Sequence, residues 1–67
     1  MADEFVNVLT TASVLEGEIV QGRLESEGIP VLLKGEGIGA PYPTGPVYVF
    51  VPASFEARAR QVLDEGN

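Results

Sequence analysis

The chain has 67 residues, ten acidic and four basic side chains, a formal net charge of −6, and no Cys, His or Trp. This length predicts one small domain, residues 1–67, that buries only about 60% of the surface its unfolded form exposes. The missing residue types exclude disulfides, Cys/His zinc sites, thiol nucleophiles and histidine general bases. We therefore expect no enzymatic activity, no metal and no cofactor.

The charge pattern also narrows the range of partners. The only basic residues are Arg23, Lys34, Arg58 and Arg60, which are too dispersed to form a phosphate-binding surface. Nucleic acids and anionic membranes are therefore unexpected partners. No segment approaches the roughly 20 apolar residues of a membrane span. The acidic N-terminus, Met-Ala-Asp-Glu, lacks the pattern of a signal peptide, so we expect a cytoplasmic protein.

The first predicted elements are a strand and a helix. Residues 5–10 are rich in β-forming side chains. Ser13 followed by Glu16 has the capping-box pattern, which predicts a helix from Ser13 to about Glu27. Gly22 is small enough to let this helix approach a sheet. The predicted core face of the helix comprises Leu15, Ile19, Val20 and Leu24.

The end of this helix is marked by Gly28, Ile29 and Pro30. A glycine at this position is typical of a Schellman stop, which predicts a contact between Ile29 and Leu24. Residues 29–34 then read as a second strand. Pro30 near its start indicates an edge strand, because proline cannot donate a ladder hydrogen bond.

Residues 35–46 contain four Gly and three Pro, which predicts an irregular loop. Residues 47–51 form the clearest strand, ended by Pro52, and a second helix begins around Ser54. The apolar residues of this helix follow one helical face. They are Phe55, Ala59, Val62 and Leu63.

The predicted order is strand, helix, strand, strand, helix. A right-handed crossover makes the first two strands parallel, and the third returns antiparallel between them. Both helices then cover one face of the sheet. We expect an α+β, βαββα ferredoxin-like sandwich with an antiparallel or mixed three-stranded sheet and no fourth strand.

Two segments carry a family resemblance. The first segment comprises residues 8–13 (Val-Leu-Thr-Thr-Ala-Ser) and residues 18–30 (Glu-Ile-Val-Gln-Gly-Arg-Leu-Glu-Ser-Glu-Gly-Ile-Pro). The second segment comprises residues 46–49 (Pro-Val-Tyr-Val), Val51-Pro52 and residues 56–63 (Glu-Ala-Arg-Ala-Arg-Gln-Val-Leu). Together they resemble a small bacterial family described as putative prokaryotic signal-transducing proteins, similar in fold to the nitrogen regulator PII. The resemblance implies a βαββα fold and a bacterial cytoplasmic location, and no catalytic residues.

In PII-like folds the loop between strands two and three carries the signal, and residues 35–46 occupy that place. The chain departs from PII because it is shorter, lacks the fourth strand and lacks the basic cluster that would hold nucleotide phosphates. Nucleotide sensing is therefore not implied. A phosphate-binding glycine loop is also not expected, because a strand rather than a helix follows Gly35, Gly37 and Gly39.

Four glutamates in the first helix invite a metal or acid/base interpretation. Pairs two residues apart on a helix do not face each other, so a solvated acidic face is the better interpretation. These residues are Glu16, Glu18, Glu25 and Glu27.

Side chains of a strand alternate between the two faces of its sheet, and this alternation predicts a candidate interaction surface. If Val47, Val49 and Val51 face the helices, the opposite face carries a large apolar patch. Its predicted members are Phe5, Leu9, Leu32, Tyr48 and Phe50. Either a partner covers this patch, or residues 35–46 fold across it with Ile38 and Tyr42.

Two functions follow from these alternatives. The first is a non-enzymatic interaction or regulatory module that forms a homodimer or binds a protein partner through the open sheet. The second is a small-ligand sensor in which residues 35–46 act as a gate, with glycines at 35, 37 and 39 that permit motion and Tyr42 that stacks on a ligand.

Overall fold

The computed structural model describes residues 4–41 and 44–65. Met-Ala-Asp at the N-terminus, used above to predict a location, and Tyr42 of the candidate loop lie outside the described residues. None of the described helices is long and apolar enough to cross a membrane. The elements are β1 (Phe5–Thr11), α1 (Val14–Ser26), β2 (Leu32–Lys34), β3 (Val47–Pro52), the 3₁₀-helix η1 (Ala53–Phe55) and α2 (Glu56–Glu65).

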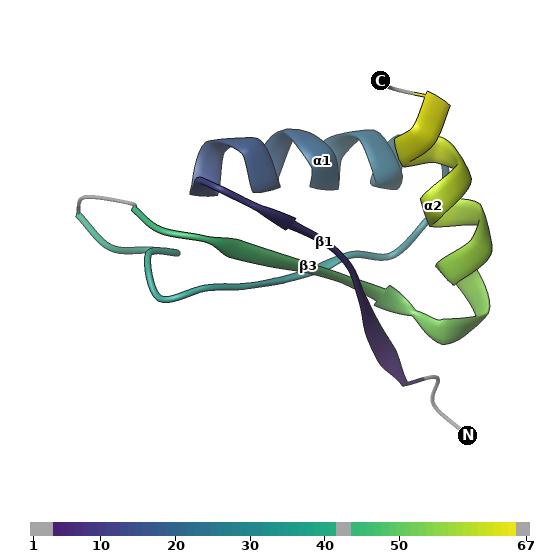
Figure 1. Cartoon of the computed structure of the whole chain (residues 1–67), viewed down its shortest axis with the longest axis horizontal. Helices are drawn as coiled ribbons and strands as arrows, with labels where there is room; N and C mark the ends of the chain where they lie inside the picture. Colours follow the sequence, from purple (N-terminus) through teal and green to yellow (C-terminus); the bar gives the residue numbers. More distant parts are fainter. Residues whose placement is uncertain (1–3, 42–43, 66–67) are drawn as a thin grey trace.

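The described strands form one sheet in the order β1-β3-β2, and both outer strands pair antiparallel with β3. The predicted central position of the third strand is therefore confirmed. Figure 1 shows α1 and α2 on the same side of this narrow sheet, with the free edge of β1 in front. The molecule measures 34 × 31 × 16 Å. This α+β arrangement is consistent with a ferredoxin-like fold.

Helix α1 begins and ends as the sequence predicts. The Ser13 hydroxyl accepts a hydrogen bond from the Glu16 amide at 3.2 Å, and the Glu16 carboxylate accepts one from the Ala12 amide at 3.3 Å. The first bond satisfies a backbone donor that the first helical turn leaves without a partner, and the second ties the Glu16 carboxylate to Ala12, the residue before the N-cap.

The helix stop is a Schellman motif. The Ile29 amide donates to the Leu24 carbonyl at 3.1 Å, and the Gly28 amide donates to the Glu25 carbonyl at 2.9 Å. Gly28 has a φ of +79°, a left-handed conformation that glycine adopts without steric cost. Leu24 and Ile29 are both fully buried in the core, which confirms their predicted association. Because Ile29 belongs to this stop, β2 begins at Leu32 rather than at residue 29.

The predicted core face of α1 is half right: Leu24 is buried and Val20 packs against the core, but the predictions for Leu15 and Ile19 are wrong. Leu15 and Ile19 are 67% and 64% exposed, while Val14, Gly17 and Leu24 are buried. A Cβ atom on Gly17 would come within 2.8 Å of the Val47 side chain, so the helix backbone approaches the sheet closely at Gly17. Gly22, which we expected in that role, has open space around it.

The core lies between the sheet and the two helices. In β3, Val47, Val49 and Val51 are fully buried and face the helices, as alternation predicts. Helix α2 buries Ala59 and Val62, and Phe55 and Leu63 pack against the same cluster. The predicted apolar face of the second helix is therefore confirmed, although a turn of 3₁₀-helix precedes its α-helical part.

A β-bulge in β1 overturns one predicted orientation. Asn7 pairs with Phe50, but Leu9 pairs with Val49, so Val8 is an extra residue in the ladder. The bulge turns Leu9 to the helix side, where it packs against the core. Thr10, paired with Tyr48, takes the position on the opposite face that we predicted for Leu9.

Candidate interaction surface

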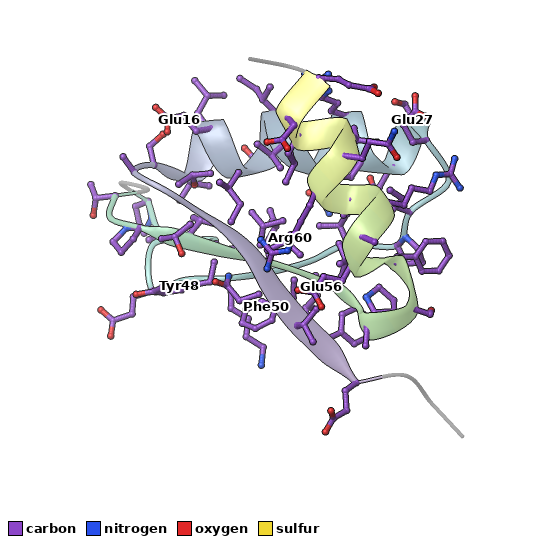
Figure 2. All side chains as sticks on the ribbon, turned by 45° about the vertical axis from the view of Figure 1, so that its right-hand side comes forward. Glu16, Glu27, Tyr48, Phe50, Glu56 and Arg60 are labelled. Carbon is purple, nitrogen blue, oxygen red and sulfur yellow. The ribbon has the colours of Figure 1, made fainter. Side chains whose placement is uncertain are left out.

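The face of the sheet away from the helices, here called the open face, is built from two cross-strand rows and Phe5. The first row is Asn7, Phe50 and Leu32, and the second is Thr10, Tyr48 and Lys34. Figure 2 shows Tyr48 and Phe50 on the side of the sheet away from α1 and α2. The register therefore brings together four of the five predicted patch residues and excludes Leu9.

The open face keeps large apolar groups in contact with water. Phe5, Tyr48 and Leu32 are 46%, 44% and 40% exposed. The described part of residues 35–46 therefore does not cover these side chains, and Ile38 of that segment is itself 40% exposed. Large apolar side chains that cluster on one exposed face are typical of an interaction surface.

Polar groups on the open face add features that alternation alone did not identify. The Lys34 ammonium lies 5.3 Å from the centroid of the Phe50 ring, within range of a cation–π interaction. The Asn7 amide donates to the carbonyls of Leu9 at 3.1 Å and Val49 at 3.2 Å, which fixes the bulge. An asparagine between two valines in a strand was the only sequence signal for this irregularity.

The loop between β2 and β3 is closely packed at its base. A Cβ atom on Gly37 would clash with the Thr44 carbonyl oxygen, and one on Gly35 would lie 2.8 Å from that of Pro46. These two glycines therefore let the two arms of the loop approach each other. Gly39 has a φ of +80°, which supports a turn. The proposed gate remains a prediction, and its base has no free space beside Gly37.

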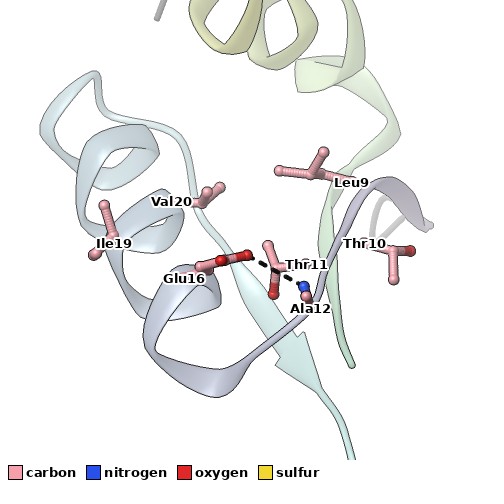
Figure 3. A pocket seen from close by; sticks show the side chains of 7 residues that line it. All are labelled: Leu9, Thr10, Thr11, Ala12, Glu16, Ile19 and Val20. Atoms are coloured by element: carbon pink, nitrogen blue, oxygen red, sulfur yellow. Dashed lines mark hydrogen bonds between the residues drawn. The ribbon is translucent and has the colours of Figure 1, made fainter. Parts of the chain in front are cut away.

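Two open pockets flank the free edge of β1, and the sequence did not predict them. The pocket between β1 and α1 has a volume of about 340 Å³. Figure 3 shows its lining residues Leu9, Thr10, Thr11, Ala12, Glu16, Ile19 and Val20. The second pocket, of about 320 Å³, lies between β1 and α2 and is lined by Val8, Leu9, Arg60, Leu63 and Asp64. Leu9 is common to both, so the pockets adjoin along the edge.

The four glutamates of the first helical segment do not converge. The Glu16 carboxylate accepts a hydrogen bond from the Ala12 amide, and Glu27, which follows α1, lies 4.0 Å from Arg58 of α2. Glu18 and Glu25 are exposed. Within residues 4–41 and 44–65, no group of three or more acidic side chains is arranged to hold a metal ion. The charges of these four glutamates are thus dispersed over the first helical segment.

Comparisons with known proteins extend this description. Neither the curated proteins nor the solved structures include a match. The model of one protein family does match, over residues 5–67, which include every described element from β1 to α2. The chain belongs to the family described as putative prokaryotic signal transducing protein.

Proposed function

We propose that this protein is a non-enzymatic interaction module in signal transduction, and that it forms a dimer through the open face. The observation that carries the proposal is the exposure of Phe5, Leu32 and Tyr48, which lie with Phe50 on a face that no described helix covers. Burying such side chains in a partner is favourable, at about 25 cal/mol for each Å² of apolar surface.

The charge distribution supports self-association through this face. Each copy carries a net charge of −6, so two copies repel each other at most orientations. The two rows of the open face and Phe5 contain no acidic residue, and Lys34 is their single charge. Two open faces can therefore meet without bringing carboxylates together.

Sedimentation velocity at micromolar concentration tests the proposal. We expect a dimer for the unchanged protein and a monomer for Phe50→Ser, because the substitution removes the central apolar group of the face. Leu15→Ser is the matched control, since Leu15 is exposed on α1, away from the open face. A monomeric parent protein whose solubility and sedimentation are the same in Phe50→Ser would contradict dimerisation through this face.

The alternative proposal is a small-ligand sensor gated by residues 35–46. The close approach of Gly37 to Thr44 gives this alternative less support, because a gate needs room to move. A thermal-shift screen against nucleotides and metabolites distinguishes the two. The interaction module predicts no shift, and a ligand that raises the melting temperature would favour the sensor.

A further inference from the structure

We propose that the free edge of β1 binds an extended segment of a partner protein that carries a basic residue at each end. This site differs from the open face, and the inference does not depend on dimerisation there. The segment adds a fourth strand beside β1, and its alternate apolar side chains enter the two pockets along that edge.

The backbone of β1 is suited to such pairing. The strand runs for seven residues, Phe5–Thr11, and pairs with β3 on one side only. It contains neither a charged residue nor a proline, two of the means by which proteins protect an exposed edge. The bulge at Val8 is the one irregularity in its pairing with β3.

The helix side of the edge offers apolar contacts to an added strand. Leu9 is half-buried and lies between the two pockets. Ile19 lines the first pocket and is 64% exposed, and Leu63 lines the second. An added strand would cover these side chains with every second residue, because alternate side chains of a strand point to the same face.

Charge decides between a second copy and a different partner. If two β1 strands paired antiparallel about their middle residue, Val8, Glu4 of one copy would lie opposite Ala12 of the other. The Ala12 amide already binds the Glu16 carboxylate. Glu4 and Glu16 of different copies would therefore come together at both ends of the pair, and such like charges are unfavourable. A segment with Lys or Arg at both ends places opposite charges there instead.

The other charges near the β1 edge also favour a partner segment with basic ends. Asp64 lines the second pocket. Arg60 lines it too, but its guanidinium pairs with the Glu56 carboxylate at 2.9 Å, which partly neutralises it. The edge therefore lies between exposed acids at residues 4 and 16. A matching segment is about nine residues long, since Glu4 and Ala12 bound the region to be paired.

The test uses two synthetic nine-residue peptides in which Thr and Val alternate between identical ends. One has Lys at both ends and the other has Glu. We expect the Lys peptide to bind the full chain at least about tenfold more tightly at low salt, and its affinity to fall as salt screens the charges. Amide chemical shifts in ¹H–¹⁵N NMR spectra should change in β1 and α1, and not in β2.

Matched variants separate charge from fold. In Glu4→Gln/Glu16→Gln, the glutamine carbonyl can still accept the hydrogen bond from Ala12, so the fold is kept while both charges are lost. This variant should lose most of the preference for the Lys peptide, whereas Glu18→Gln/Glu25→Gln should keep it. Phe50→Ser should also bind the Lys peptide normally, which distinguishes this site from the open face.

Three results would overturn the inference. The first is equal binding of the two peptides, or no binding of the Lys peptide at millimolar concentration. The second is that the peptide changes amide chemical shifts only in β2 or on the open face. The third is a change in the chemical shifts of the β1 amides with protein concentration in the absence of any peptide. Such a change would mean that a second copy of the chain binds this edge.

Discussion

The two edges of the sheet are built differently. The β2 edge is only three residues long, ends in Lys34 and follows shortly after Pro30. Shortness, lysine and proline all discourage further pairing. The β1 edge is seven residues long and has no charge. The β2 edge therefore resists further pairing more than the β1 edge does.

The two edge strands are also held in place by different local structures. The chain enters β2 from the Schellman stop, in which Leu24 and Ile29 are buried together. The β1 strand is held to β3 around a bulge that the Asn7 side chain bridges. Substitutions in the Schellman stop should lower the stability of the whole domain, and substitutions at the bulge should affect mainly β1.

The largest expected effect is that of Leu24→Ala. Leu24 is fully buried, so its truncation removes apolar contacts and leaves a cavity beneath the helix stop. We expect the free energy of unfolding to fall by about 2–5 kcal/mol, measured by urea denaturation with circular dichroism. Leu15→Ala is the control: the same change at a 67% exposed site should stay within about 0.5 kcal/mol. Equal effects at the two sites would contradict the observed helix face.

Gly28→Ala should have the next largest effect. A Cβ atom on Gly28 would meet no neighbour within 4 Å, so the cost is that of its left-handed φ of +79°, roughly 1–2 kcal/mol. Gly22→Ala makes the same chemical change inside α1, again with open space. There it should stabilise the protein by about 0.4–1 kcal/mol. Opposite shifts in melting temperature are the expected outcome, and shifts of the same sign would contradict it.

Asn7→Ala should have the smallest global effect and act on the β1 edge. It removes a donor that two carbonyls share, at a net cost of about 1 kcal/mol. We expect faster amide hydrogen exchange in β1, with little change in β2. Thr10→Ala, on the same face of β1, is the control and should leave the exchange of β1 amides nearly unchanged. Uniform acceleration across the sheet would mean that the bulge is not an independent unit.

Local signals in the sequence predicted much of the fold. Ser13 with Glu16, and Gly28 with Ile29, fix the ends of α1 through short-range hydrogen bonds. The alternation of Val47, Val49 and Val51 identified the buried face of the central strand. These features depend on residues close together in the chain.

The errors concern contacts between distant residues. The inward face of α1 follows from the close approach of Gly17 to Val47, which outweighs the apolar character of Leu15 and Ile19. The orientation of Leu9 depends on a register shift against β3, and one extra residue reverses every side chain beyond it. Neither the bulge nor the pockets beside β1 can be read from periodicity alone.

The molecule is only 16 Å across in its smallest dimension, and so small a domain has little stability to spare. A domain of 67 residues has roughly 3–10 kcal/mol of stability in total. A partner present at 100 times its dissociation constant adds about 2.7 kcal/mol, a large share of that total. Unoccupied copies would unfold more often and be degraded sooner. The abundance of the protein in the cell should therefore follow the abundance of whatever covers its exposed surfaces.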